Sequence, residues 1–264
     1  MTASTEGASD EQAPALARRA GRELVLEIVF RPLSNALVPL LRVLRLTPAA
    51  VVLANAATGL AAAVALARGE LVLAAALLQA KTLLDNCDGQ LARATGRVTL
   101  TGRYLDTVAD LVVNACVFAA LGHVTGRPLL ALAAFVALTL LLAVDFNVTE
   151  LYREARGTPT PQPTPTGTRA ERLLASVYRI VFAPLDRLVR GFAAGRFEGG
   201  GGYDSFTVTA LANLGLSTQL LVLGVCLVLD APVAYLVVVL VCLLALVPLQ
   251  LRAELVAVRR RRAA

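Results

Sequence analysis

Four aspartates gather in a short stretch of a very apolar chain. They are Asp85, Asp88, Asp106 and Asp110, all within residues 83–110. Acids spaced three or four residues apart lie on one face of a helix. Four carboxylates so close together repel one another in a low dielectric, so either some are protonated or cations neutralise them. Hard divalent ions such as Mg²⁺ or Mn²⁺ prefer oxygen ligands, and four carboxylates suit a site for two such ions.

The rest of the chain is typical of an integral membrane protein. It has 264 residues, of which 57% are hydrophobic, and its mean hydropathy is +0.68. Its formal net charge of +6 comes almost entirely from arginine. In a membrane protein this bias indicates topology and anionic lipid head groups, so no nucleic-acid partner is expected. The cysteines show no CxxC spacing and are predicted to be small core residues.

The apolar segments predict an all-α fold, a polytopic membrane bundle of six transmembrane helices. A span needs about 20 apolar residues. Six segments meet this length, at about 48–67, 70–92, 103–122, 128–148, 206–229 and 231–250. The arginines concentrate on the connections that would face one side, and the positive-inside rule makes that side the cytoplasm, with both termini in it. The expected location is a bacterial inner or cell membrane, since the composition is rich in arginine and poor in lysine.

Two amphipathic segments accompany the spans. In residues 15–46 arginines alternate with apolar residues, and Pro32 and Pro39 are expected to interrupt the helix. Residues 169–195 repeat the pattern after a Pro/Thr-rich linker that is expected to be extended. Both segments are expected to lie on the inner membrane surface. The predicted organisation is a disordered N-terminal tail (1–14), an amphipathic interfacial segment (15–46), a six-helix catalytic domain (47–250) that includes a cytoplasmic linker and amphipathic segment (150–205), and a basic C-terminal tail (251–264).

A short turn at residues 94–101 should fold the second and third spans into an antiparallel hairpin. Asp88 comes shortly before this turn and Asp106 shortly after it, so the two aspartate pairs should face each other at similar depth. An alternative is that the acids pair with nearby arginines at the membrane edge. That alternative does not explain why two pairs share one face, and ionisable clusters inside membranes are usually functional. Lys81, one turn before Asp85, is expected to pair with it.

The aspartates belong to a longer motif that resembles the signature of the CDP-alcohol phosphotransferase family, also called CDP-alcohol phosphatidyltransferases. The motif reads Asp85-x-x-Asp88-Gly89-x-x-Ala92-Arg93, then eight residues, then Gly102-x-x-x-Asp106-x-x-x-Asp110. The resemblance implies that Asp85, Asp88 and Asp106 bind two divalent cations, Mg²⁺ or Mn²⁺. It implies that Asp110 is the general base and lies near a metal as well. It also implies a nucleotide-binding side formed by Gly89, Ala92, Arg93 and Gly102, and a homodimer.

The resemblance implies a reaction in phospholipid biosynthesis, in which a substituted phosphate moves from a CDP-linked donor to an alcohol and CMP leaves. The expected donor is CDP-diacylglycerol, which would supply a phosphatidyl group. The same motif also fits a CDP-linked polar head group donated to a lipid alcohol or an inositol phosphate. A cation or proton transporter that uses the acidic cluster is the alternative of another class. Candidates for the acceptor site, at the inner end of the fourth span and just after it, are Asp145, Asn147, Arg153 and Arg156.

Overall fold

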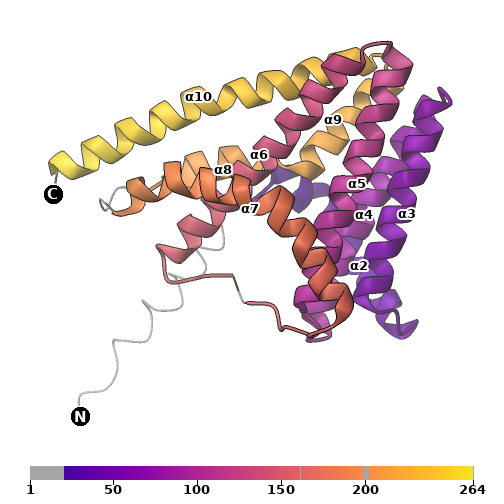
Figure 1. The fold of residues 1–264 in the computed structure, drawn as a ribbon, viewed down its shortest axis with the longest axis horizontal. Helices are drawn as coiled ribbons and strands as arrows, with labels where there is room; N and C mark the ends of the chain where they lie inside the picture. The colour runs from indigo at the N-terminus through magenta and orange to yellow at the C-terminus, as the bar shows by residue number, and fades with distance from the viewer. Residues whose placement is uncertain (1–20, 161, 199–201, 264) are drawn as a thin grey trace.

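The computed structural model describes residues 21–160, 162–198 and 202–263, and the described chain is almost entirely helical (Figure 1). Its elements are a π-helical turn η1 (Leu26–Phe30) and the helices α2 (Arg31–Val43), α3 (Pro48–Ala67), α4 (Leu71–Ala94), α5 (Leu100–Thr125), α6 (Pro128–Glu154), α7 (Arg169–Glu198), α8 (Ser205–Ala212), α9 (Leu216–Val228) and α10 (Pro232–Ala263). No strand occurs among these residues, so the all-α class is confirmed. The tail predicted at residues 1–14 lies outside the described residues.

Within the described chain, four helices are long and apolar enough to cross a membrane, namely α3, α5, α6 and α10. The pair α8 and α9 makes a fifth span if the two helices, bent by 44° at their break, are counted as one. The remaining predicted span, α4, has 24 residues but carries charged side chains in its second half. Length and apolarity alone therefore do not identify α4 as a span. The membrane-embedded helical architecture holds, and the count of six stays a prediction.

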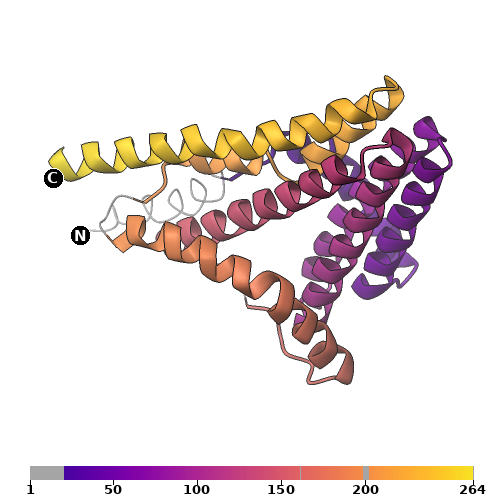
Figure 2. The ribbon, with the colours of Figure 1, turned by 45° about the horizontal axis from the view of Figure 1, so that its top comes forward.

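The helices α3, α4 and α5 run side by side and form the part of the bundle that carries the site (Figures 1 and 2). Small residues let these helices approach closely. A Cβ atom placed on Gly59 of α3 would lie only 2.4 Å from Cγ1 of Val113 in α5. The contact between α3 and α5 thus depends on the absence of a side chain at residue 59. Helix α9 covers α4, and α6 covers α5 on its other side.

The turn between α4 and α5 is held by hydrogen bonds within itself and by others from the Pro/Thr linker. Gly96 has a positive φ of 65°, which glycine adopts without strain. Thr99 caps α5, because its hydroxyl accepts a hydrogen bond of 3.1 Å from the backbone N–H of Gly102. The Pro/Thr linker then crosses this turn: Leu100 N donates to Thr164 O (2.9 Å), and Thr164 N donates to Val98 O (3.0 Å). The segment that carries the motif is therefore held by the chain that leads into α7.

Both amphipathic segments form helices in the part that the structure describes, which leaves out residues 15–20, and one detail of the prediction was wrong. Helix α2 passes through Pro39 without ending, so the interruption expected there is wrong, whereas the π-helical turn η1 runs into α2 directly before Pro32. Helix α7 includes all of the predicted segment at residues 169–195, and it packs on α5 and α6. Helix α10 continues far beyond the apolar stretch, so the segment predicted as a basic tail forms its last turns (Figure 1).

Candidate active site

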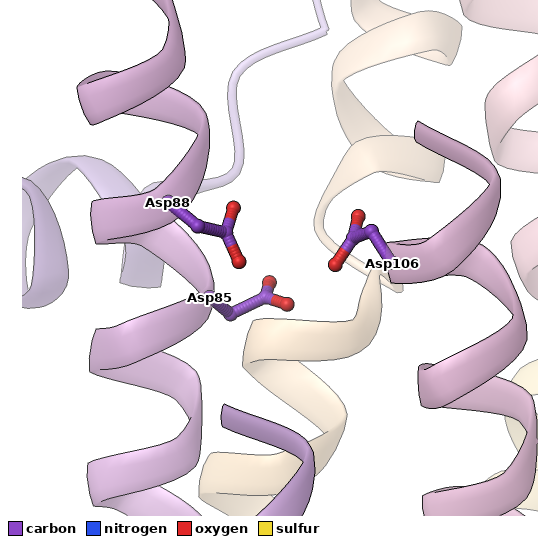
Figure 3. Close-up of side chains that lie close together, drawn as sticks. All are labelled: Asp85, Asp88 and Asp106. Carbon is purple, nitrogen blue, oxygen red and sulfur yellow. The ribbon is translucent and has the colours of Figure 1, made fainter. Parts of the chain in front are cut away.

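Three of the four aspartates converge between α4 and α5. Asp85 and Asp88 project from α4, and Asp106 projects toward them from α5 (Figure 3). One carboxylate oxygen from each lies within 4.8 Å of the others. The hairpin predicted from the short turn therefore forms and brings these aspartates together. Oxygen atoms at such distances can bind the same divalent cation.

Two oxygens of this group have no hydrogen-bond donor among the described residues. They are Oδ2 of Asp88 and Oδ1 of Asp106, and both atoms are buried. A buried carboxylate oxygen without a partner is costly, because it has lost the water that solvated it. A bound cation would remove this cost, and Mg²⁺ and Mn²⁺ prefer oxygen ligands of this kind. The residues present thus fit the divalent ions that the sequence predicted.

The fourth aspartate, Asp110, is not among the three whose oxygens lie within 4.8 Å of one another, and it is bound to a buried lysine. Nζ of Lys81 donates a hydrogen bond of 2.7 Å to Oδ1 of Asp110, and it lies 4.0 Å from Oδ1 of Asp85. The Lys81 side chain is only 1% exposed. The predicted partner, Asp85, is thus the more distant of the two acids. Lys81 supplies one positive charge to an acidic site and links α4 to α5.

Asp85 is oriented by a residue of a third helix. Asn55 lies in α3 and is buried, and its Nδ2 atom donates a hydrogen bond of 3.1 Å to Oδ1 of Asp85. A positioned donor of this kind restricts the rotation of a carboxylate and prepares it for a ligand. Helices α3, α4 and α5 therefore all contribute to the acidic group.

A large cavity opens beside the aspartates, with a volume of about 710 Å³. This outer cavity is lined by residues of the motif, of the α4–α5 turn and of α6. The motif residues in its wall are Asp88, Gly89, Ala92, Arg93, Gly102 and Asp106. Its volume is within the range of about 300–1,000 Å³ that is usual for ligand pockets. The predicted nucleotide-binding residues thus share one cavity with two of the predicted metal ligands.

The two motif glycines in this wall leave room that a side chain would fill. A Cβ atom on Gly89 would lie 3.3 Å from a guanidinium nitrogen of Arg93. A Cβ atom on Gly102 would lie 3.1 Å from the hydroxyl of Thr99, which caps α5. Glycine at both positions therefore keeps the cavity open and leaves the Arg93 side chain and the Thr99 cap undisturbed.

A second, smaller cavity of about 280 Å³ lies farther along α5, between α5, α6 and α7. This inner cavity shares Arg103, Asp106 and Phe146 with the outer one. Asp110 lines the inner cavity. The other polar and aromatic residues in its wall are Thr107, Asn114, Phe135, Thr139, Tyr178, Phe182 and Asp186. Asp88 therefore lines the outer cavity, Asp110 lines the inner one, and the two cavities meet at Asp106.

Helix α7 supplies three of the residues of the inner cavity. The hydroxyl of Tyr178 donates a hydrogen bond of 2.6 Å to Oδ2 of Asp186. Burial and this bond to a carboxylate raise the pKa of Tyr178, so its hydroxyl remains a donor. Sequence reasoning missed these residues, because nothing in an amphipathic helix shows which face it turns toward a distant cavity. Asn114 and Thr139, polar residues inside apolar spans, were the signals that could have indicated the inner cavity.

The four acceptor-site candidates fall into two groups. Asp145 and Arg153 line the outer cavity, where Arg153 donates to Oγ1 of Thr160 at 3.0 Å. Asn147 is fully buried and connects α6 to α7, because it donates to Oδ1 of Asp186 at 2.7 Å. Arg156 stacks on the ring of Tyr152, with its guanidinium carbon 4.0 Å from the ring centroid. The structure thus brings two of the candidates to a cavity and places the other two in contacts within or between helices.

These features define a helical membrane protein whose apolar helices enclose an acidic cluster, able to hold a metal ion, beside a ligand-sized cavity. A family model described as CDP-alcohol phosphatidyltransferase matches residues 45–193, more than half of the chain. The chain belongs to this family. The match includes all eight motif residues, the helices α3 to α6 and most of α7. Membership implies the transfer of a phosphate-linked group from a CDP-alcohol to an alcohol in a membrane. No protein in a comparison with curated sequences matches the chain.

Proposed function

We propose that this protein is a divalent-metal-dependent phosphotransferase that moves a phosphatidyl group from CDP-diacylglycerol to an alcohol, releases CMP and acts in phospholipid biosynthesis. One observation carries the proposal. Carboxylates from α4 and α5 converge with buried, unpartnered oxygens at the edge of the cavity that contains the nucleotide motif. That arrangement provides a place for cations next to a place for a nucleotide, which is what a diphosphate substrate needs.

In this proposal the acids divide the chemistry between them. Asp85, Asp88 and Asp106 would hold two Mg²⁺ or Mn²⁺ ions, which would supply positive charge to a diphosphate bound beside them. The alcohol oxygen forms a new bond to the phosphorus next to the lipid, and the bond from that phosphorus to the CMP oxygen breaks. Asp110 accepts the proton of the alcohol as general base. Lys81 holds this carboxylate in place, because its Nζ donates a hydrogen bond of 2.7 Å to Oδ1 of Asp110.

The nucleotide occupies the outer cavity in this proposal. Arg93 lies beside Gly89 and reaches the cavity, where its planar guanidinium suits a phosphate oxygen. Ala92 and Gly102 leave space for the nucleotide to approach the backbone. The acids lie close to the α4–α5 turn, which the positive-inside rule places at the cytoplasmic face. A CDP-linked donor would then reach the site from the cytoplasm.

The direct test is the release of CMP by the purified protein in detergent, with CDP-diacylglycerol and a panel of alcohols, in the presence of Mg²⁺ or Mn²⁺. We expect release that needs both an alcohol and a divalent ion and that stops when the ion is chelated. Mutation of a residue that only hydrogen-bonds a metal ligand usually reduces metal affinity or activity by roughly 10–100-fold. Asp88→Asn removes a proposed ligand itself, so its activity should fall further. It should also raise the metal concentration needed. Release independent of metal, or full activity of Asp88→Asn, would refute the proposed role of the cluster.

A further inference from the structure

The two cavities that meet at Asp106 differ in what they contain. The proposed nucleotide-binding residues, including Gly89, Arg93 and Gly102, line the outer cavity, whereas Asp110 lines the inner cavity. Asp106 lines both. A donor whose nucleotide fills the outer cavity would bring its phosphates to Asp106, at the border between the two cavities. The inner cavity would then lie on the side of the phosphorus that faces away from the nucleotide.

Phosphoryl transfer places the attacking oxygen and the leaving oxygen roughly in line, on opposite faces of the phosphorus. A nucleotide that leaves into the outer cavity requires an alcohol that approaches from the other side. A general base must also lie within hydrogen-bond reach of the hydroxyl that it deprotonates. Asp110 meets this requirement for a hydroxyl in the inner cavity.

From this arrangement, and on the basis of the proposed function, we infer that the inner cavity is the acceptor subsite and that it takes a small alcohol without a phosphate group. The acceptor hydroxyl points toward Asp106 and Asp110, and the rest of the molecule extends between α5, α6 and α7. The wall contributed by α7 is part of the subsite, so this amphipathic helix determines which alcohol is used.

The size of the inner cavity limits the acceptor. Its volume of about 280 Å³ lies just below the range of about 300–1,000 Å³ that is usual for drug-sized ligands. A polyol or an amino alcohol has few heavy atoms and fits such a space. An alcohol that carries two acyl chains is far larger and does not fit.

The polar groups of the wall suit hydroxyls better than they suit a phosphate. Among the described residues of the lining, Arg103 is the one cation, and its guanidinium lies 5.4 Å from the ring centroid of Phe146 at the border with the outer cavity. A phosphate is usually bound by several cationic groups or N–H donors. The inner cavity instead offers the side chains of Thr107, Asn114 and Thr139, which suit hydroxyl groups.

Aromatic residues form the remaining sides of the inner cavity. Phe135 and Phe146 belong to α6, and Tyr178 and Phe182 belong to α7. Tyr178 stacks on Phe182, with ring centroids 5.4 Å apart. Aromatic faces bind the C–H groups of a polyol or the ammonium group of an amino alcohol. They offer nothing to an anion.

Helix α7 is held firmly enough to act as a wall. Asp186 accepts hydrogen bonds from Tyr178 of its own helix and from Nδ2 of Asn147 of α6. Nε of Arg190 donates to Oδ1 of the same Asn147 at 3.1 Å. At the other end of α7, Glu171 is bound to the threonines before it and to Thr101 of α5. Both ends of the wall are thus tied to the helices that carry the site.

The test compares apparent KM values for the alcohol and for CDP-diacylglycerol in two cavity variants. Thr139→Leu adds bulk to the wall, and the Thr139 hydroxyl bonds only to Phe135 O of its own helix among the contacts described, so no distant partner loses a bond. Phe182→Ala enlarges the cavity from the side of α7. Ile180→Ala, on the exposed face of α7, is the matched control. We expect Thr139→Leu to raise the KM of the alcohol at least tenfold and to leave the KM of the donor unchanged.

The choice of alcohol provides the second readout. The wild type should use glycerol, inositol or ethanolamine in preference to glycerol 3-phosphate or inositol 1-phosphate, and Phe182→Ala should accept larger alcohols. The inference would be overturned by an unchanged KM for the alcohol in both cavity variants, or by a preference for phosphorylated alcohols. Metal-dependent CMP release in the same experiment would still support the proposed function. Absence of CMP release with every alcohol would instead overturn the proposed function, and the acceptor subsite with it.

Discussion

At the scale of single residues, the environment of Asp110 differs from that of the other three acids. Asp85, Asp88 and Asp106 approach one another, whereas Asp110 is bound to Lys81. The spacing along α4 favoured Asp85 as the partner of Lys81, since the two lie one turn apart. The shorter distance to Asp110 arises because α4 and α5 both pack against α3, an arrangement that the sequence of one helix does not contain. A separate environment agrees with a separate role in proton transfer.

The variant Asp110→Asn tests that role. It cannot accept a proton, so we expect turnover to fall by about 10²–10⁴-fold, the usual contribution of a general base. The affinity for CMP or CDP should not change, because Asp110 lines the inner cavity and the nucleotide is proposed to bind in the outer one. Steady-state kinetics together with nucleotide binding by calorimetry would measure both effects. Normal turnover in this variant would exclude Asp110 as the base.

At the scale of secondary-structure elements, the site depends on how closely three helices approach one another. Gly59 lets α3 lie against Val113 of α5, and the stem of Lys81 passes beside the same glycine. The α4–α5 hairpin and its short turn were predictable, because the apolar segments stop at residues that break or cap helices. The wall that α7 gives to the inner cavity was not predictable, because its contacts are with side chains that are distant in the sequence.

The variant Gly59→Ala should destabilise the bundle. The added Cβ atom would lie 2.4 Å from Cγ1 of Val113 and 3.2 Å from Cδ of Lys81. Val113 is buried and β-branched, so it cannot turn away. We expect a loss of about 1–3 kcal/mol in the free energy of unfolding, as for other overpacked cores.

Thermal unfolding in detergent, with activity measured in parallel, would test this expectation. Adding Val113→Ala to the Gly59→Ala variant should restore part of the lost stability, because it removes the clashing atom. Gly191→Ala is the matched control, since a Cβ atom on this helical glycine meets no atom within 4 Å. Equal unfolding temperatures for Gly59→Ala and Gly191→Ala would contradict the close contact between α3 and α5.

The attachment of α7 to α5 should depend on pH. Hydrogen bonds from the backbone N–H and the hydroxyl of Thr166, and one from the hydroxyl of Thr101, hold the pKa of Glu171 below its ordinary value. A carboxyl whose pKa is lower in the folded protein stabilises it above the ordinary pKa. That stabilisation is lost as the pH falls through the lowered value. Acidification should therefore release the start of α7 from the α4–α5 turn.

Hydrogen exchange of residues 164–171, measured from neutral pH down to about pH 3, would follow this release. The protection of these amides should decrease as the solution becomes acidic. Glu171→Gln carries no titrating group, so its protection should be weaker at neutral pH and should no longer change with acid in this range. A wild-type protein whose protection is constant, or rises, on acidification would exclude Glu171 as the group that holds α7.

At the scale of the whole molecule, most of the fold could be predicted from the sequence. The predicted span at 48–67 has the same limits as α3, and the spans at 70–92 and 103–122 differ from α4 and α5 by a few residues. Long apolar segments with breaks between them determine such limits. The break between α8 and α9 was not predicted, because the residues around Asn213 are apolar enough to continue a span. Of the site, the motif predicted the acidic cluster and a nucleotide-binding side whose residues line the outer cavity, whereas the inner cavity arises only from the packing of α5, α6 and α7.

Thiol labelling can determine whether α4 crosses the membrane. Glu70 and Thr95 are exposed and lie at the two ends of α4. In a background with alanine at Cys87, Cys116, Cys226 and Cys242, Glu70→Cys and Thr95→Cys place one reactive thiol at either end. A membrane-impermeant reagent added to intact cells should label position 70 and should reach position 95 only after the cells are opened. Labelling of both positions from one side would exclude the predicted six-span topology.

The ion pair between α4 and α5 also has a consequence for the biosynthesis of the protein. A charged residue at the centre of a helix raises the cost of its insertion by about 2.5–3.5 kcal/mol, and α4 carries Lys81 together with the acids that follow it. Alone at the translocon, α4 is therefore a poor candidate for release into lipid. Once α5 has been synthesised, Asp110 neutralises Lys81 at 2.7 Å, and the two charges can enter the bilayer as a pair. We therefore expect α4 to enter the membrane only together with α5, so that the hairpin that carries the site is integrated as one unit.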